Sequence, residues 1–288
     1  MFKIISFSFL VVIPAIIFAQ NSSSLVKRDT TESESTDKTR WQMLGYDGKA
    51  AVGSVLNAFS QPVRWQGKDW LTFGGVAAGT AILYAFDDNT QRFFNDQEDD
   101  IPQVVKEFGF RIGKPLINYG LTTGIYVTGL ITKNEKIRRT GVLLIASATA
   151  GGLIQSVVKT VAGRARPGTG LGKDQFRFYD ERAGFHSLPS GHTVLAVTTA
   201  HALAKQFKNP FTKTGIYLIG AISPISRIWS GAHWVTDVFL GAAMSVAIVE
   251  GVDHYLNRKE FYSNYKKTAA IRWNLSVGAG SLGLRGTF

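Results

Sequence analysis

Long apolar runs, separated by polar connections, dominate the chain between residues 70 and 252. The runs are rich in Ala, Gly, Leu, Ile and Val, and their lengths fit helices better than strands. They cover Trp70–Phe86, Pro115–Thr132, Thr140–Val158, Gly191–Ala204, Thr214–Ser226 and Val238–Val252. The pattern therefore predicts an all-α fold, a helical bundle of about six core helices.

Amphipathic and alternating segments flank this core. Apolar residues at helical spacing predict amphipathic helices on the N-terminal side, at Gly48–Ser60 and Ile101–Phe110. In the tail, apolar Trp273, Leu275 and Val277 alternate with polar residues before a glycine-rich turn. This period of two predicts a short C-terminal β-hairpin with one apolar face, which we expect to pack against the bundle or a partner.

The first residues, 1–19, have the pattern of an export signal. Lys3 supplies a positive charge, Ile4–Phe18 is apolar, and Ala19 ends a suitable cleavage site. We expect cleavage there. An uncleaved membrane anchor is the alternative.

Three further regions follow the signal. Residues 20–40 are rich in Ser, Thr and charge, with almost nothing to bury, which predicts a disordered linker. We expect a helical domain over residues 41–268 and the β-hairpin over residues 269–288.

Composition narrows the function. The net charge is +11, which suits an anionic partner such as a nucleic acid, an anionic membrane or a phosphorylated substrate. A nucleic acid is not expected, because the chain has no glycine-rich nucleotide loop and no basic–aromatic array. The absence of cysteine excludes disulfides, thiolate metal sites and cysteine nucleophiles.

Three cations interrupt the apolar pattern where the third run ends. Lys159 falls in the last helical turn, Gly163 can terminate the helix, and Pro167 holds Arg166 extended. Cations at a helix C-terminus can simply compensate the helix dipole. We accept that interpretation, with a solvated charge, for Arg164. The roles of the other two depend on what else meets them in the fold.

The stretch "SLPSGHT" precedes the fourth run. Ser190 can cap a helix that begins near Gly191, and the first amides of that helix form a site for an anion. His192 would then lie beside a bound phosphate, where it can pass a proton to a leaving oxygen. A simple cap followed by a surface histidine is the alternative.

A histidine and an aspartate lie four residues apart at the start of the sixth run. On a helix, His233 and Asp237 would stack on one face, and the carboxylate would orient the imidazole. The alternatives are a structural pair and a pair of metal ligands. Three nearby cations, Lys159, Arg166 and Arg227, disfavour a metal ion, so we expect no metal and no cofactor.

Together these stretches resemble the three signature motifs of the type 2 phosphatidic acid phosphatase family. The motifs are "K(x)6RP" at Lys159–Pro167, "PSGH" at Pro189–His192 and "SR(x)5H(x)3D" at Ser226–Asp237. That family includes bacterial acid phosphatases, lipid phosphatases and the vanadium haloperoxidases. The resemblance covers Trp70 to about His254.

The resemblance implies a phosphoric monoester hydrolase that needs no metal. His233 is the implied nucleophile and forms a phosphohistidine, Asp237 orients it, and His192 is the general acid and base. The implied phosphate-binding residues are Lys159, Arg166, Ser190, Gly191 and Arg227. The substrate would be a lipid phosphate such as phosphatidic acid, or a small phosphate ester.

Two other functions use the same motifs. A vanadium haloperoxidase would hold vanadate on His233 in the same cage. A non-catalytic membrane protein would use the cage only to bind phosphate. A homo-oligomer is compatible with each of the three interpretations.

Two short basic connections, Lys133–Arg139 and Lys205–Lys213, bear on where the protein lies in the cell. Both are expected at the end of the bundle opposite the motifs. Positive residues favour the cytoplasm, which would put the motifs outside. If the signal is cleaved, the chain starts outside the cytoplasm, and the basic connections then fall one membrane crossing away from the side that this rule favours. An exported bundle, periplasmic or resting on an envelope membrane, removes the conflict, and we expect it. An integral inner-membrane protein is the alternative.

Overall fold

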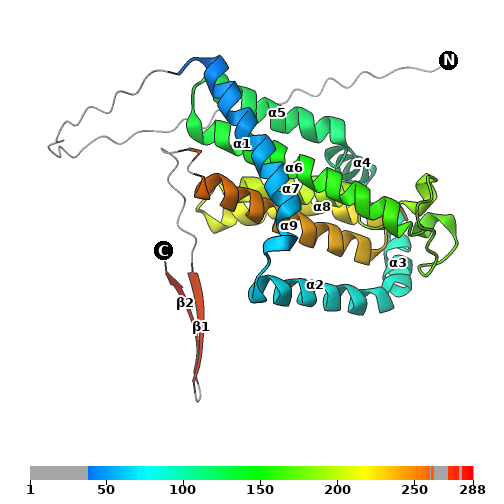
Figure 1. Cartoon of the computed structure of the whole chain (residues 1–288). Helices are drawn as coiled ribbons and strands as arrows, with labels where there is room; N and C mark the ends of the chain where they lie inside the picture. The colour runs from blue at the N-terminus through cyan, green and yellow to red at the C-terminus, as the bar shows by residue number, and fades with distance from the viewer. Residues whose placement is uncertain (1–37, 260, 263–271, 279–280, 288) are drawn as a thin grey trace, which may run out of the picture. The chain divides into compact units, whose positions relative to one another are not determined.

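The computed structural model describes residues 38–259, 261–262, 272–278 and 281–287. Within these residues the chain forms nine α-helices (Figure 1). They are α1 (Arg40–Ser60), α2 (Gly67–Ala85), α3 (Asp87–Asn95), α4 (Gln103–Ile112), α5 (Pro115–Ile131), α6 (Glu135–Ala162), α7 (Gly191–Ala204), α8 (Pro210–Trp229) and α9 (Val235–Arg258). The predicted all-α bundle is confirmed, and each apolar run coincides with a helix to within a few residues.

Several helices are longer than predicted, and one was not predicted: α1 begins at Arg40 rather than Gly48, and α9 ends at Arg258 rather than Val252. Helix α8 is longer than the run Thr214–Ser226, because the Asn209 side chain caps it at Pro210 and it continues to Trp229. Helix α3 was not predicted at all. It has nine residues, and the side chains it buries are polar, so it leaves no apolar pattern in the sequence.

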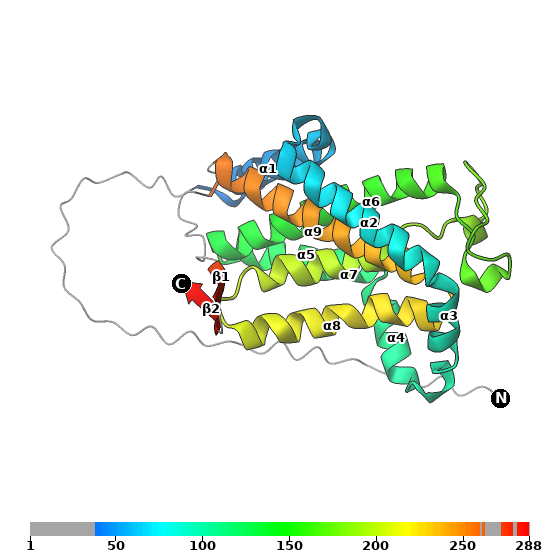
Figure 2. The same cartoon turned by 90° about the horizontal axis from the view of Figure 1, so that it is seen from below.

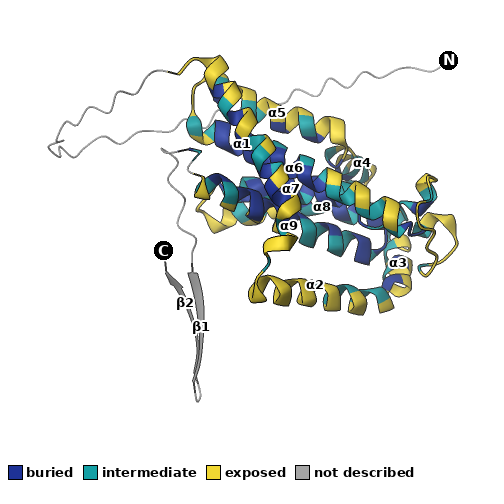
Figure 3. Ribbon diagram, viewed as in Figure 1, coloured by how far each residue is buried: buried dark blue, intermediate teal, exposed yellow. Residues whose placement is uncertain are grey.

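Helix α6 forms the centre of the core and contacts α1, α5, α7 and α9 (Figures 1 and 3). The turn between α5 and α6 is tight because glycines lie in the contact. A Cβ at Gly129 would overlap the backbone of Arg138, and one at Gly141 would overlap Tyr126. Close approach of the backbones is therefore built into the sequence of this pair of helices.

Buried ion pairs tie the first helix to the core. Asp47 of α1 is buried, accepts from Arg138 Nε at 2.7 Å, and accepts from the Tyr126 hydroxyl at 3.0 Å. Arg139 donates to Asp253 of α9 at 2.5 Å. Both arginines of the basic connection Lys133–Arg139 are therefore buried and paired with carboxylates.

Helix α2 contrasts with the core because none of its residues is buried (Figure 3). It contacts α9, where Gly79 faces Phe239, and leaves Trp70 and Leu71 exposed by 54% and 77%. In the described part of the chain, α6 and α9 are long and apolar enough to cross a membrane, each with a mean hydropathy of 1.7.

The tail contains two strands, β1 (Arg272–Gly278) and β2 (Ser281–Thr287). They pair antiparallel, with Leu275 opposite Leu284. The predicted signal, 1–19, and nearly all of the predicted linker lie outside the described residues.

Candidate functional site

The three motif stretches lie in connections at one end of the bundle, beside α3 (Figures 1 and 2). The first connection begins where Lys159 occupies the last turn of α6. Gly163 ends the helix in the left-handed region, with φ +57°, and a Cβ there would overlap the Arg177 carbonyl. Arg166 follows in an extended conformation, as predicted, and its guanidinium donates to the carbonyl of Ala183.

The second connection ends in the predicted helix cap. Ser190 is buried, and its hydroxyl accepts from the Thr193 amide at 3.4 Å, which confirms it as the N-cap of α7. Gly191 is the first helical residue, and a Cβ there would come within 2.8 Å of the Gln155 side chain. The amide of Ser190 donates to the Asp237 carbonyl at 3.1 Å. That bond joins the second connection to the third.

The third connection holds the histidine–aspartate pair, but not on one helix face as expected. His233 precedes α9, which Trp234 caps, because the Trp234 amide donates to Asp237 Oδ2 at 2.8 Å. Gly231, with φ +59°, turns the chain just before. His233 Nδ1 still faces Asp237 Oδ2 at 3.6 Å, and both side chains are buried. The helix cap, rather than helical stacking, brings the two side chains together.

Arg164 also departs from the prediction. It is not a solvated charge: only 1% of the residue is exposed. Its guanidinium donates to Asp237 at 2.8 Å and to Asp87 of α3 at 2.7 Å. A dipole argument at the end of α6 could not reveal these partners, because both lie far away in the sequence.

Charges from all three connections converge on the two histidines. Burial lowers the pKa of His192 to about 3, and the nearby Arg227, His233, Lys159 and Arg166 act in the same direction. Burial also lowers the pKa of His233 to about 4, where Asp237 opposes the change and the cations reinforce it. Lys159 and Arg166 therefore lie close enough to act on both imidazoles, Arg227 lies close enough to act on His192, and all three cations are half-buried. Such a group of cations favours an anion.

Comparison with known proteins identifies this arrangement. Residues 140–260, which include all the predicted site residues, match the family model of the PAP2 superfamily. Residues 140–260, the part of the chain that matches, belong to the PAP2 superfamily. It is 26% identical to the lipid A 1-phosphatase of Rhizobium etli over 205 residues, 63% of this chain and 81% of that protein. It is 30% identical to the lipid A 1-phosphatase of Porphyromonas gingivalis over 103 residues, 34% of this chain and only 23% of that protein.

One solved structure, Aquifex aeolicus LpxE, is similar with a TM-score of 0.45 and 20% identity. The similarity covers 60% of this chain and 95% of that one.

The PAP2 residues are completed by side chains that the motifs do not contain. Phe110 of α4 stacks on the His192 ring, with centroids 5.5 Å apart and planes 12° apart. The Arg227 guanidinium lies 4.7 Å and the Lys114 ammonium 4.1 Å from the Phe110 centroid. The sequence placed Phe110 on an amphipathic helix and gave no sign that this helix reaches the site.

The His192 Nε2 atom of the PAP2 site is buried without a hydrogen-bond partner in the described part of the chain. Buried polar atoms are normally satisfied. An unpaired nitrogen close to half-buried cations fits a site shaped for a ligand. No cluster of three potential metal ligands occurs among the described residues.

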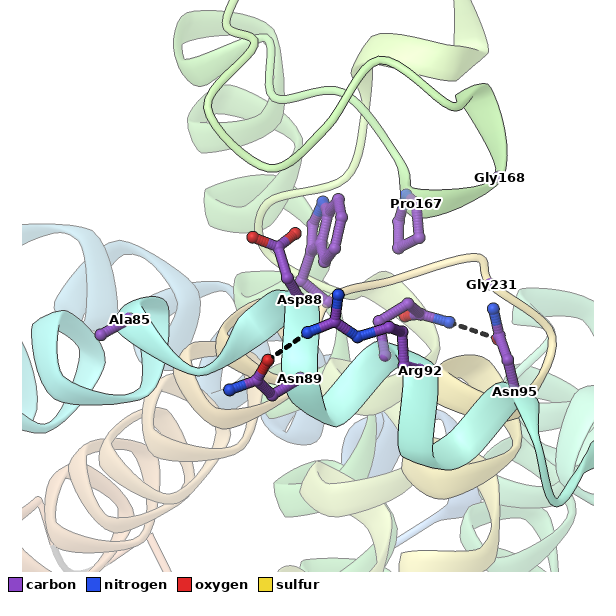
Figure 4. A pocket seen from close by; sticks show the side chains of 10 residues that line it. Ala85, Asp88, Asn89, Arg92, Asn95, Pro167, Gly168 and Gly231 are labelled. Carbon is purple, nitrogen blue, oxygen red and sulfur yellow. Dashed lines mark hydrogen bonds between the residues drawn. The ribbon is translucent and has the colours of Figure 1, made fainter.

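A polar cavity of about 440 Å³ adjoins the PAP2 motifs (Figure 4). Asp88, Asn89 and Arg92 of α3 form one wall. Gly168 and Gly231, each two residues from a predicted site residue, form the other, and Gly168 donates to the Gly231 carbonyl at 2.9 Å. Helix α3 thus borders the connections that carry Arg166 and His233.

Proposed function

We propose that this PAP2 protein is a phosphoric monoester hydrolase that dephosphorylates a lipid phosphate through a phosphohistidine, without a metal ion. The observation that carries the proposal is that Lys159, Arg166 and Arg227 lie close to the half-buried His192 at a capped helix N-terminus, and that the first two also act on the buried His233. Cations and free amides so arranged complement the oxygens of a phosphate group.

In the first half-reaction, the cage holds the non-bridging oxygens of the ester. The side chains of Lys159, Arg166 and Arg227, with the Ser190 hydroxyl and the Gly191 amide, spread the transition-state charge. His233 Nε2 donates its electron pair to phosphorus as the ester P–O bond breaks. Asp237 stabilises the positive charge that develops on the ring. His192 gives a proton to the departing alkoxide, which leaves as an alcohol.

In the second half-reaction, neutral His192 takes a proton from water. The resulting hydroxide attacks phosphorus, and the P–N bond breaks with its electron pair returning to His233. Phosphate leaves, and His192 is again protonated. Because burial and the surrounding cations lower the pKa of His192, a bound phosphate dianion is needed to raise it again.

Two observations support a lipid substrate. The relatives named above are lipid A phosphatases, and the bundle exposes long apolar side chains beside helices able to enter a membrane. We infer that the protein is exported and associated with an envelope membrane, with its site outside the cytoplasm. An integral inner-membrane arrangement is the alternative.

Release of phosphate from phosphatidic acid, a lipid A phosphate and p-nitrophenyl phosphate tests the proposal. We expect His233→Ala to lose at least about a thousandfold in kcat on all three, because the nucleophile is gone. His254→Ala is the matched control, since His254 is exposed near the end of α9, and it should keep full activity.

The two other functions give different results in the same assays. A haloperoxidase loaded with vanadate would oxidise halide at the expense of added hydrogen peroxide, whereas a phosphatase is only inhibited by vanadate. A non-catalytic phosphate-binding protein would release no phosphate from any of the three compounds. Wild-type protein that bound phosphate without turnover would therefore end the proposal.

A further inference from the structure

A second buried carboxylate, Asp87, lies behind the residues at which the chemistry is placed. It is fully buried at the first position of α3, outside the residues that the family model matches. Its Oδ2 accepts from Arg164 Nη2 at 2.7 Å and from the Thr236 hydroxyl at 2.6 Å. Its Oδ1 accepts from the Thr236 amide at 3.1 Å. Both oxygens of this buried carboxylate are therefore hydrogen-bonded.

Arg164 connects this carboxylate to the histidine–aspartate pair. It donates through one nitrogen to Asp87 and through the other to Asp237 Oδ1, at 2.7 and 2.8 Å. The remaining Asp237 oxygen, Oδ2, faces His233 Nδ1 at 3.6 Å. A continuous buried series therefore runs from Asp87 through Arg164 and Asp237 to His233.

The charges along this series do not cancel. With a neutral His233, the two carboxylates and one guanidinium leave one negative charge. Without Asp87 the series would be neutral, because Arg164 would offset Asp237 alone. Burial limits screening by solvent, so this difference reaches the imidazole.

The other charged groups near His233 are unfavourable to positive charge on its ring. Lys159 and Arg166 lower its pKa, and His192 faces it from α7. On the opposite side, the Arg164 guanidinium packs against the Tyr84 and Trp234 rings, which carry no charge at neutral pH. The excess negative charge of the series is therefore the main counterweight to the cations of the cage.

We propose that Asp87 is a positioning residue that supplies this excess negative charge, and so lets His233 become positively charged when it attacks phosphorus. The inference rests on the proposed function of His233. It assigns a part in the reaction to helix α3, which lies outside the family motifs. Asp87 itself does not touch the substrate.

The test is the Asp87→Asn variant, followed by the pH dependence of kcat/KM and by NMR titration of the His233 ring. Removing a negative charge lowers the pKa of His233, so the acidic limb of the kcat/KM profile moves to lower pH by about one unit. We expect kcat to fall about tenfold while KM changes less than twofold. Ionisation of the substrate contributes equally in all variants. A difference between variants in the pH of the acidic limb therefore arises from the protein.

Two variants separate charge from structure. Asp88→Asn makes the same substitution one residue later, where the carboxylate is half exposed and pairs with Lys173, and should leave the limb in place. Thr236→Val removes hydrogen bonds to the series without changing its charge, so it should lower stability but not move the limb. If Asp87→Asn does not fold, Asp87→Ser, which leaves room for water at the guanidinium, is expected to give the same shift.

The possible failures are distinguishable. If the wild type releases no phosphate, the proposed function fails, and the NMR titration still measures whether Asp87 acts on His233. An active wild type whose limb and titration stay unchanged in Asp87→Asn overturns the inference alone. An equal shift in Asp88→Asn or Thr236→Val would also overturn it.

Discussion

At the scale of single residues, the proposed mechanism requires the protonation of His192 to depend on whether an anion is bound. His233 is 2% exposed, and burial and cations lower its pKa to about 4, which suits a nucleophile that must be neutral. The same causes lower the pKa of His192 to about 3, which leaves it neutral in the empty site at pH 7. In the proposed mechanism, a bound phosphate dianion would offset most of the positive charge of the three cations, so that His192 becomes a proton donor when substrate is present.

These shifts predict a bell-shaped pH profile of kcat. Activity rises with pH as His233 loses its proton, and falls again as His192 loses its proton in the substrate complex. His192→Gln should abolish the alkaline limb. In kcat/KM, which reports formation of the phosphohistidine, it should cost about a hundredfold or more on an alkyl phosphate, but much less on p-nitrophenyl phosphate, whose leaving group needs no proton. Equal losses on both substrates would contradict a general-acid role.

At the scale of the elements, the sequence was sufficient wherever an apolar pattern or a cap decides the structure. The helix over Gly191–Ala204 and its Ser190 cap were predicted as the structure has them. It was insufficient where long-range partners decide. Arg164 is buried by two carboxylates, one of them on an unpredicted helix, and Phe110 reaches the site from α4. Local spacing carries no information about such contacts.

Two glycines of the first connection form a matched pair for testing the local structure of the first motif. Gly163 and Gly170 both have positive φ, but only at Gly163 would a Cβ meet other atoms. We expect Gly170→Ala to cost about 1 kcal/mol of unfolding free energy from backbone strain alone. Gly163→Ala adds overlap with the Arg177 carbonyl, and should cost at least about 2 kcal/mol and impair phosphate release.

Thermal and denaturant unfolding of the two variants checks this expectation. A Gly163→Ala protein as stable and as active as Gly170→Ala would show that the first connection is not held in the way described.

At the scale of the whole molecule, exposed apolar side chains and charged groups lie on different parts of the bundle. Leu71 of α2, Leu116 of α5 and Phe211 of α8 are exposed by 77%, 83% and 85%. At the end opposite the motifs, Lys136 donates to the Gln206 carbonyl at 3.5 Å, which joins the two basic connections. A bundle with apolar sides and a cationic site at one end fits an enzyme that takes its substrate from a lipid surface.

The absence of cysteine makes this orientation measurable. Thr169, beside the first motif, and Lys208, at the opposite end, are both exposed and can each be replaced by cysteine. In spheroplasts, a membrane-impermeant maleimide should label both variants if the bundle is exported. Label on Thr169→Cys alone would establish the integral arrangement. No label on Thr169→Cys before lysis would contradict an outward-facing site.

The most direct measurement is to trap the covalent intermediate. Protein mixed with a ³²P-labelled phosphate ester, quenched in alkali and digested should carry one acid-labile phosphoryl group on the peptide that contains His233. The label should accumulate in His192→Gln with p-nitrophenyl phosphate, because that variant cannot activate water, and should be absent from His233→Ala. Steady turnover with no trapped phosphate, or with phosphate on another residue, would contradict the account.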